Sequence, residues 1–367
     1  MISIAVTGGP SSGKTTVIDK IVTELRQFGY NVIVSPEMAT ITINSGILPA
    51  GDNAINDVTF QQIILMRQLV FEQTCLMAAK ELGDNTVILF DRGTLDGYAY
   101  VDKDKWDYVL ESQNQKSLNL LANYDAVIYL EGKDDFFTTE NNEARYEKSA
   151  DEARLKGEKV LQSYLSHDNL LIVKAQERFE DKQKNVLNIV ENLLGNPTSL
   201  KEQRKYLVTD IDVDKLSTIA NKVVITQDYL KEEDGCEYRL RKMERDGDAT
   251  YHYCQQKKME NGLREVIKSS TIERKEYLRL LQNKSPEFAT CVKTRYSFVY
   301  NRQYFRLDIF PDNLMVLEVN VTKENPEVSL PEFINTVEEV TNKEEYQNIN
   351  IARRRQQEYG KRKINSN

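Results

Sequence analysis

The sequence predicts two domains: an α/β domain built on a parallel sheet, followed by an α+β domain with an eight-stranded antiparallel β tunnel. Three observations lead to this fold class. At 367 residues the chain is long for a single compact domain. Residues 1–195 alternate short apolar runs with helical stretches, whereas residues 200–325 consist of successive strand-like segments separated by turn signals. The segment "GNPTS" (195–199) marks the predicted break between them.

Five short apolar runs make up the predicted sheet of the first domain, residues 1–195. Continuous apolar runs suit strands that are buried on both faces, and the helical stretches between them suit the crossovers that parallel strands require. The runs are "ISIAV" (2–6), "NVIV" (31–34), "TVILF" (86–90), "DAVIYL" (125–130) and "LLIVKA" (170–175).

Eight strand-like segments rich in Tyr, Val and Thr make up the second domain, residues 200–325, together with one helix, "ERKEYLRLLQ". Short strands at this spacing, with turns such as "RDGD" and "PDN", favour a mainly antiparallel barrel or tunnel. The strands are "RKYLVT", "KVVITQDYL", "EYRLRKM", "ATYHYCQQKK", "REVIKSST", "CVKTRYSFVY", "QYFRLDIF" and "LMVLEVNVT". Residues 326–367 form a predicted helical, basic tail that contains "ARRRQQEYGKRK".

Composition excludes several classes of protein. A net charge of −8 argues against a general nucleic-acid binder, which needs an excess of Lys and Arg. The sequence shows no signal-peptide pattern and no apolar run of membrane-spanning length, so we expect a cytoplasmic protein. A disulfide framework or zinc site is not expected, because no CxxC occurs among the cysteines and histidines, which are Cys75, Cys236, Cys254, Cys291, His167 and His252.

The segment "GGPSSGKT" (Gly8–Thr15) fits the pattern G-x-x-x-x-G-K-[ST] between a predicted strand and a predicted helix. In this context backbone amides surround phosphate oxygens, Lys14 reaches the terminal phosphates and Thr15 ligates Mg²⁺. We therefore expect Mg²⁺ with GTP or ATP to bind here. The predicted nucleotide-binding residues are Gly8, Gly9, Pro10, Ser11, Ser12, Gly13, Lys14, Thr15, Thr16 and Arg92.

Three further side chains are candidates for chemistry at the phosphates. Glu37 and Asp91 follow predicted strands, and ligands of open parallel sheets bind at the carboxyl ends of strands. Asp91 would hold Mg²⁺ with Thr15, and Glu37 would accept a proton or orient water. Arg145 lies in a polar segment where a lid would close on the phosphoryl group. The sequence leaves open that Glu37 caps a turn, Arg92 pairs locally and Arg145 is a surface residue.

The first domain resembles a known P-loop family. "TGGPSSGKTT", "SPEM", "FDRGTLDGYAY" and "ARYEKSADEA" are together similar to the small AAA-like family that includes bacterial ribosylnicotinamide kinase. The resemblance covers residues 1–195 and adds Asp96 and Tyr98 as pocket residues. It implies a mononucleotide-kinase type of fold and Mg-nucleotide binding, and it leaves the substrate and the persistence of phosphoryl transfer open.

Charged residues in the second domain alternate along their strands. Glu237, Arg239 and Arg241 alternate along "EYRLRKM", as do Lys293 and Arg295 along "CVKTRY", so each set lies on one face of its strand. If the sheet closes, these cations and Lys205 point into one interior, where their mutual repulsion favours an anionic occupant. An outward-facing, solvated stripe is the alternative that the pattern leaves open.

The second domain resembles the CYTH, or triphosphate tunnel, superfamily. "RKYLV", "VVITQDYL", "EYRLR", "KTRYSF", "FRLDIF" and "VLEVN" follow the order of that family's motifs. The family implies a tunnel whose cations bind polyphosphate and whose glutamates hold a catalytic metal. This chain departs from it: Lys201, Gln203 and Lys205 replace E-x-E-x-K, and Asn320 follows Glu318. Lys257 or Lys258 completes the predicted set of cations, which is Lys205, Arg239, Arg241, Lys257, Lys293 and Arg295.

The combination resembles a group of eukaryotic P-loop plus CYTH-like proteins that includes a fly protein of TRP-channel trafficking. That resemblance implies GTP and phosphoinositide binding. The leading hypothesis is a nucleotide-controlled protein that binds a phosphate-rich small molecule or phosphoinositide without metal-dependent hydrolysis, with peripheral membrane contact. The competing hypothesis is a small-molecule (nucleoside- or ribosylnicotinamide-like) kinase, and a working triphosphatase is third. Whether the protein is an active P-loop NTPase or phosphotransferase stays open at this point.

Overall fold

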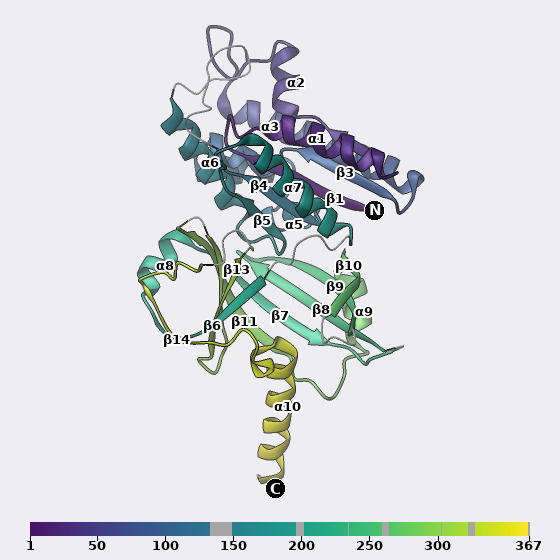
Figure 1. The fold of residues 1–367 in the computed structure, drawn as a ribbon, viewed down its shortest axis with the longest axis vertical. Coiled ribbons are helices and arrows are strands. Elements are labelled where there is room, and N and C mark those ends of the chain that lie inside the picture. Colours follow the sequence, from purple (N-terminus) through teal and green to yellow (C-terminus); the bar gives the residue numbers. More distant parts are fainter. Residues whose placement is uncertain are drawn as a thin grey trace. The chain divides into compact units, whose positions relative to one another are not determined.

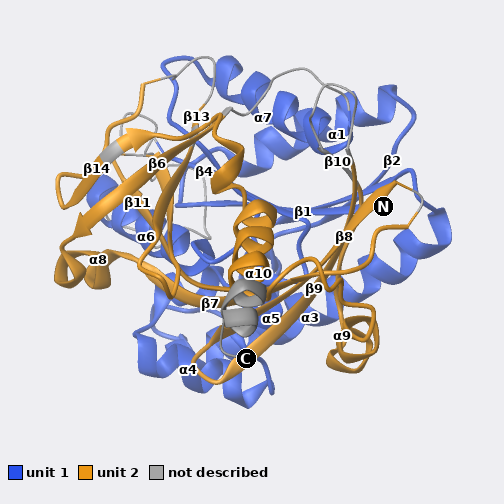
Figure 2. Ribbon diagram, turned by 90° about the horizontal axis from the view of Figure 1, so that it is seen from below, with its two compact units in different colours: residues 1–200 blue, residues 201–367 orange. Residues whose placement is uncertain are grey.

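The computed structural model describes residues 1–132, 149–195, 202–233, 235–258, 264–301, 303–321 and 327–365. The chain forms two compact units, residues 1–200 (unit 1) and 201–367 (unit 2), which are coloured separately in Figure 2. No helix in these residues has the length and apolar character that a membrane span requires. The candidate site residues are distributed over both units.

Unit 1 contains the predicted parallel sheet, with five strands in the order β2-β3-β1-β4-β5 (Figure 1). Every neighbouring pair is parallel. Every residue of β3 and of β4 is buried, which explains why their sequences are continuous apolar runs and not alternating ones. The strands are β1 (Ile2–Gly8), β2 (Asn31–Ser35), β3 (Thr86–Asp91), β4 (Ala126–Leu130) and β5 (Leu170–Val173).

Helices cover the sheet of unit 1. On one face, Ile21 of α1 and Val186 of α7 pack with Ile4, Leu89 and Ile128 of the strands in one apolar core. On the other face, Phe90 of β3 meets Tyr124 edge to face, and the Tyr124 hydroxyl reaches Glu72 of α3. The helices are α1 (Lys14–Gln27), α2 (Met38–Asn44), α3 (Asp57–Leu82), η1 (Asp96–Tyr100), α4 (Lys103–Ser112), α5 (Ser117–Leu121), α6 (Ala150–Tyr164) and α7 (Phe179–Leu193).

Unit 2 is built on an antiparallel sheet of nine strands in the order β10-β9-β8-β7-β11-β12-β13-β6-β14. Its eight predicted strands are all present, and β14 is an additional one. In the described residues β10 and β14 are the two edges, so the hydrogen-bonded sheet is open and its closure into a tunnel stays a prediction. The strands are β6 (Glu202–Ile211), β7 (Asn221–Tyr229), β8 (Cys236–Arg245), β9 (Asp248–Lys258), β10 (Arg264–Ile272), β11 (Cys291–Tyr300), β12 (Gln303–Ile309), β13 (Met315–Val321) and β14 (Ile334–Glu339).

The extra strand β14 lies in the segment expected to be a helical tail. It pairs with β6, and its register shifts twice between Asn335 and Glu338. Its sequence, "INTVEE", is short and lacks a regular alternation of apolar and polar residues, so the period-2 pattern did not reveal it. The predicted helix appears later, as α10 (Asn348–Asn365), after the short η3 (Glu344–Tyr346).

Helices pack on both faces of the sheet in unit 2. Leu216 of α8 (Val213–Ile219) packs with Phe298 and Leu317, and Tyr277 of α9 (Arg274–Leu281) packs with Leu240, all on one face. The opposite face receives the first turns of α10, whose buried residues lie against Tyr229, Cys291, Phe310 and Val316. Figure 2 shows α10 within the curve of the sheet.

Candidate functional site

The loop between β1 and α1 has the geometry of a phosphate cradle. The Nζ of Lys14 donates to the carbonyls of Gly9 (2.8 Å) and Gly8 (3.2 Å) and lies 3.3 Å from the Ser12 hydroxyl. Burial, and then the charge of Arg92, lowers the pKa of Lys14 to about 8. Gly8 is required by space, because a Cβ atom there would lie 2.3 Å from the Leu130 carbonyl.

Thr15 and Asp91 lie next to each other, as the sequence predicted for a pair of Mg²⁺ ligands. The Thr15 hydroxyl donates to Oδ2 of Asp91 at 2.9 Å. Oδ1 of Asp91 is buried, and no donor among the described residues reaches it. Burial raises the pKa of Asp91. A hydroxyl and an unengaged carboxylate oxygen suit a Mg²⁺ ion that takes its remaining ligands from water and phosphate.

Arg92 and Glu37 form an ion pair at the edge of the cradle. The Nε of Arg92 contacts Oε1 of Glu37, and its Nη1 lies 3.4 Å from the Gly8 carbonyl and 3.3 Å from Asp96. Burial favours a higher pKa for Glu37, but Arg92 and Lys14 outweigh it and lower the pKa to about 2. Arg92 therefore forms ion pairs with Asp96, four residues along the chain, and with the other candidate, Glu37, which is distant in sequence and precedes α2.

Asp96 has a supporting position behind these groups. It accepts hydrogen bonds from the hydroxyls of Thr7 (2.7 Å) and Tyr164 (2.8 Å) and from the Gly93 amide (3.2 Å). Asp96 also lines the cavity of unit 1, whereas Tyr100 and not Tyr98 lines it from the same short helix. Tyr98, which the family resemblance suggested as a pocket residue, therefore does not line this cavity, and Tyr100 does.

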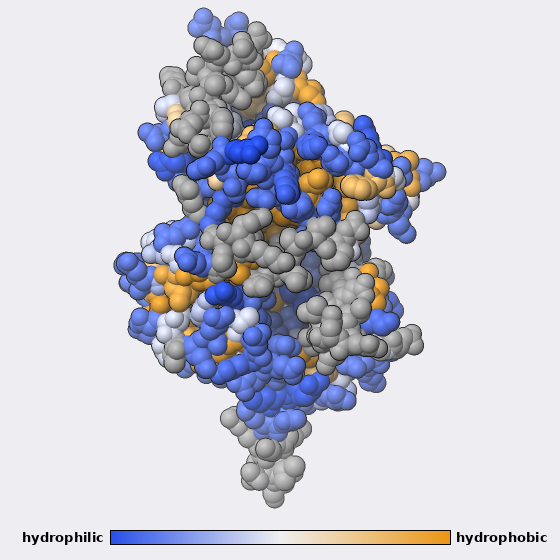
Figure 3. All heavy atoms as spheres, in the orientation of Figure 1, coloured by the Kyte–Doolittle hydropathy of each residue, from blue (hydrophilic) through white to orange (hydrophobic). Residues whose placement is uncertain are grey.

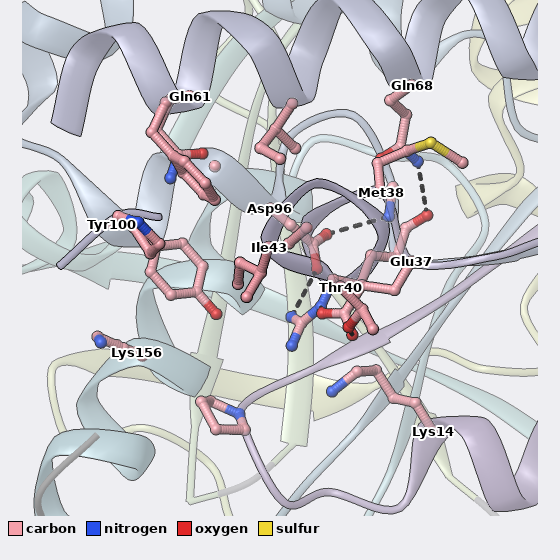
Figure 4. Close-up of a pocket in the computed structure, with 18 of the residues that line it drawn as sticks. Lys14, Glu37, Met38, Thr40, Ile43, Gln61, Gln68, Asp96, Tyr100 and Lys156 are labelled. Atoms are coloured by element: carbon pink, nitrogen blue, oxygen red, sulfur yellow. Dashed lines mark hydrogen bonds and ion pairs between the residues drawn. The ribbon is translucent and has the colours of Figure 1, made fainter. Parts of the chain in front are cut away.

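A cavity of about 590 Å³ extends from the cradle between α2, α3 and η1 (Figure 4). Gln68 of α3 lines its polar end together with Lys14, Thr15, Glu37, Arg92 and Asp96. Its other end has apolar and aromatic walls, which sequence reasoning missed: Ile43, Phe60, Ile64, Tyr100 and Trp106. The long apolar stretch of α3, which is too hydrophobic all round for a simple surface helix, was the available signal. Lys156 of α6 also lines the cavity, while the predicted lid residue Arg145 lies outside the described residues.

In unit 2 the strand register places most of the predicted cations on one face, which we call the charged face. Lys205 pairs with Glu318, Arg295 with Asp308, and Arg241 with Gln227 across neighbouring strands. Arg239 and Lys293 share the parity of these residues along β8 and β11. Lys257 does not join them: it pairs with Cys236, which has the opposite parity to Arg239, and its side chain is exposed.

Two buried carboxylates bind four of the cations on the charged face. Asp308 forms ion pairs with Lys293 and, through two hydrogen bonds of 2.7 and 2.8 Å, with Arg295. Glu318 lies 3.0 Å from the Nζ of Lys205 and 3.5 Å from Arg306. Burial opposes ionisation of Glu318, but Arg306, Lys205 and Arg295 hold its pKa well below the usual range. The sequence analysis missed Arg306 and Asp308, although they alternate in "FRLDIF".

The residues around Glu318 do not suit a divalent cation. Gln203 donates to Oε2 of Glu318 at 3.2 Å, and Lys205 contacts Oε1. A metal at Glu318 would therefore lie beside an ammonium group and an amide donor, where a metal site needs further oxygen ligands. The side chain of Asn320 lies outside the described part of β13. In the described residues no group of three or more acidic, Cys or His side chains is placed to hold a metal.

Residues 3–182 match the family model of an AAA domain. Unit 1 is thus an AAA-like P-loop domain of the nucleotide-binding class. Solved structures give weak neighbours. The inorganic triphosphatase NE1496 is 26% identical over 42% of this chain and 95% of that chain, with a TM-score of 0.32. The PH1819 protein of Pyrococcus horikoshii OT3 is 15% identical over 36% of this chain and 80% of that chain, with a TM-score of 0.27. No curated protein matches the chain, so the likeness to channel-trafficking proteins rests on sequence motifs alone.

Proposed function

We propose that this chain binds Mg²⁺ with GTP or ATP in unit 1 and a phosphate-rich anion, such as a phosphoinositide headgroup, on the charged face of unit 2. The second ligand is bound without metal-dependent hydrolysis. By resemblance, such a protein would act as a cytoplasmic regulator of membrane traffic with peripheral membrane contact. One observation carries the proposal: the Nε of Arg239 is buried without a hydrogen-bond acceptor in the described residues, on the same face as five other cations.

The nucleotide half rests on the cradle of unit 1. Lys14, Thr15 and Asp91 are the groups that a Mg-nucleotide requires. Lys14 and Thr15 line one end of the cavity, and Asp91 accepts the hydrogen bond of the Thr15 hydroxyl. Thr15 and Asp91 would hold the Mg²⁺, which when bound would supply positive charge that neutralises the phosphates. The chain itself supplies the backbone amides of the loop, the Lys14 ammonium and the Thr15 hydroxyl, which bind and orient the phosphates.

The anion half rests on unbalanced charge. Asp308 and Glu318 neutralise part of the set formed by Lys205, Lys293, Arg295 and Arg306. Arg239 and Arg241 add two guanidinium groups near Tyr229, where they act to lower its pKa against the effect of burial. Two like charges 4 Å apart repel by about 4 kcal/mol at an effective dielectric constant of 20, and a polyphosphate relieves this repulsion.

Paired substitutions test the anion half. Arg239→Gln with Arg241→Gln should weaken binding of inositol hexakisphosphate, and of vesicles that contain a phosphoinositide, by at least about tenfold, because two charge-assisted contacts are lost. Lys242→Gln is the matched control, since Lys242 lies on the same strand with the opposite parity and pairs with Glu244. Unchanged affinity in the double variant rejects the site. Rapid Mg-dependent hydrolysis of tripolyphosphate would instead show a working triphosphatase.

A small-molecule kinase is the second candidate, and the apolar, aromatic end of the 590 Å³ cavity favours it. An acceptor bound there would place a hydroxyl near Glu37, which is ionised at neutral pH because its pKa is about 2. A panel of nucleosides and phosphorylated metabolites decides between the candidates. Turnover that is abolished by Lys14→Ala and by Glu37→Gln supports the kinase, whereas nucleotide binding with only slow hydrolysis supports the regulatory protein.

A further inference from the structure

Lys182 is a buried lysine of α7 that the nucleotide-binding motif does not include. Its side chain is 5% exposed. The Nζ donates to the Ser12 carbonyl at 2.9 Å and to the Glu131 carbonyl at 2.6 Å. Lys14 binds the carbonyls at the start of the cradle, so two ammonium groups together hold three carbonyls of one loop.

The contact to Ser12 fixes the direction of an amide. In a trans peptide the carbonyl and the N–H of the next residue lie in one plane and point in opposite directions. An ammonium group on the Ser12 oxygen therefore directs the N–H of Gly13 away from α7. Ser12 and Gly13 both line the cavity where the phosphates are proposed to bind.

The first turn of α7 supports this arrangement by packing. Phe179 precedes Lys182 by three residues, which places both side chains on one side of the helix. A Cβ atom at Gly13 would lie 2.4 Å from Cε2 of Phe179, so the ring fills the space beside the loop. Gly13 has φ of 81°, a left-handed conformation that glycine adopts without strain. Phe179 packs beside the Ser12–Gly13 peptide and Lys182 binds its carbonyl, so both contacts restrict its orientation.

We propose that Lys182 positions the phosphate-binding loop: through the Ser12 carbonyl it turns the Gly13 amide toward the nucleotide phosphates, and its charge adds to their binding. This inference rests on the proposed nucleotide binding in unit 1. Lys182 is a positioning residue, because its contacts are to the loop and not to the reacting groups. The positive charge matters because anions that bind the amides of this loop also favour the ammonium form of a lysine beside it.

The charge of Lys182 changes with pH within the range over which nucleotide affinity can be measured. Burial lowers the pKa of Lys182 to about 8, and the nearby carboxylate of Glu131 partly opposes this effect. That carboxylate is itself held by the Ala175 amide at 3.0 Å. Bound phosphates raise the pKa of Lys182, so its contribution to affinity is complete below about pH 8 and is lost as the pH rises above it.

Nucleotide affinity measured on the full chain tests the proposal. Trp106 is the sole tryptophan of the sequence and lines the cavity, so its fluorescence reports binding of Mg-ATP or Mg-GTP. At pH 7, Lys182→Met should bind about tenfold more weakly than the wild type, since a hydrogen bond from a charged group is lost. Lys182→Arg should restore most of the affinity. Lys184→Met is the matched control, because Lys184 is an exposed lysine of the same helix.

The pH profile separates positioning and charge from a purely structural role. The gap in affinity between the wild type and Lys182→Met should narrow as the pH is raised from 7 to 9.5. A gap that does not change with pH, or equal affinities at pH 7, overturns the proposal.

If Lys182→Met does not fold, Lys182→Gln replaces it. If neither variant folds, the pKa values of the wild-type lysines are measured by NMR titration of their Cε signals, and the Lys14 signal is identified by its loss in Lys14→Met. A second signal must then titrate near pH 8, and its pKa must rise when nucleotide binds. The absence of such a signal overturns the proposal. A wild-type protein that binds neither nucleotide overturns the proposed function itself.

Discussion

Arg92 shows how buried side chains hold a functional residue in an uncommon conformation. Its φ of 75° is left-handed, which costs a non-glycine residue of order 1 kcal/mol or more. Its amide donates to the Val6 carbonyl at 3.0 Å, and its carbonyl accepts from Gln68 of α3 at 2.9 Å. The next residues are held as well, since Tyr124 accepts from the Thr94 amide at 2.8 Å. These contacts keep the guanidinium directed at Glu37.

Glu72 contacts both Gln68 and Tyr124, and its burial disfavours the ionised carboxylate. It accepts from the hydroxyl of Tyr124 at 2.6 Å and from Gln68 at 3.1 Å, and burial raises its pKa to about 7. The raised pKa means that folding favours the protonated form, so this contribution to stability is present below the ordinary value of 4.5 and is lost as the pH rises through 7.

We predict that Glu72→Gln becomes more stable relative to the wild type as the pH increases from 4.5 to 8. The amide keeps an acceptor for Tyr124 but never ionises, so the relative gain in the free energy of unfolding should approach about 3 kcal/mol. Urea unfolding at pH 4.5, 6 and 8 measures it. Glu111→Gln, at an exposed position of α4, supplies the control for a generic loss of charge. A difference that is constant over this pH range would contradict the prediction.

At the scale of elements, strand parity decided what could be predicted from the sequence. Period-2 spacing placed Arg239 with Arg241, and Lys293 with Arg295, on common faces of their strands, and the register joins them in one sheet face. The parity of Lys257 relative to β8 depends on the hairpin register, which local sequence does not specify. The pairing of Glu37 with Arg92 joins residues 55 positions apart, so it depends on the order of strands and not on a motif.

The element whose contribution was least predictable is α10. Its basic composition suggested a solvated tail, yet Ile351 and Ala352 are fully buried against the charged face, and Asn348 accepts from Lys293 at 3.0 Å. Hydrophilic residues cover the part of α10 that is visible in Figure 3. The helix is thus a two-part element in which a short apolar start is followed by a polar extension.

We predict that ending the chain at Gln347 destabilises unit 2 by several kcal/mol. The truncation exposes Phe310 and Val316 and removes the buried side chains of Ile349 and Ile351, each worth about 1.5–3 kcal/mol. Ending the chain at Glu358 is the control, because it keeps these contacts and the ion pair of Arg355 with Asp312. Urea unfolding followed by far-UV circular dichroism compares the two. Equal stability of both truncated chains would show that the start of α10 does not contribute.

At the scale of the whole molecule, the change of sequence pattern near residue 200 coincides with the division into residues 1–200 and 201–367. Each unit has its own apolar cores, because the cluster around Ile4 and Val186 lies in unit 1 and those around Phe298 and Phe310 lie in unit 2. Because the cores are separate, the two units can unfold separately. A ligand bound to one unit should then stabilise that unit alone.

We predict two calorimetric transitions for the full chain, each raised by a different ligand. A ligand at 100 times its Kd adds about 2.7 kcal/mol to the unit that binds it, which corresponds to roughly 5–10 °C for units of this size. Mg-GTP or Mg-ATP should raise one transition, and Lys14→Ala should abolish that shift. Inositol hexakisphosphate should raise the other, and the Arg239→Gln, Arg241→Gln variant should abolish it. Since each variant leaves the other unit intact, it also serves as the control for that unit's ligand. A single transition that both ligands raise would show that the units unfold as one body and would remove the basis for assigning the ligands separately.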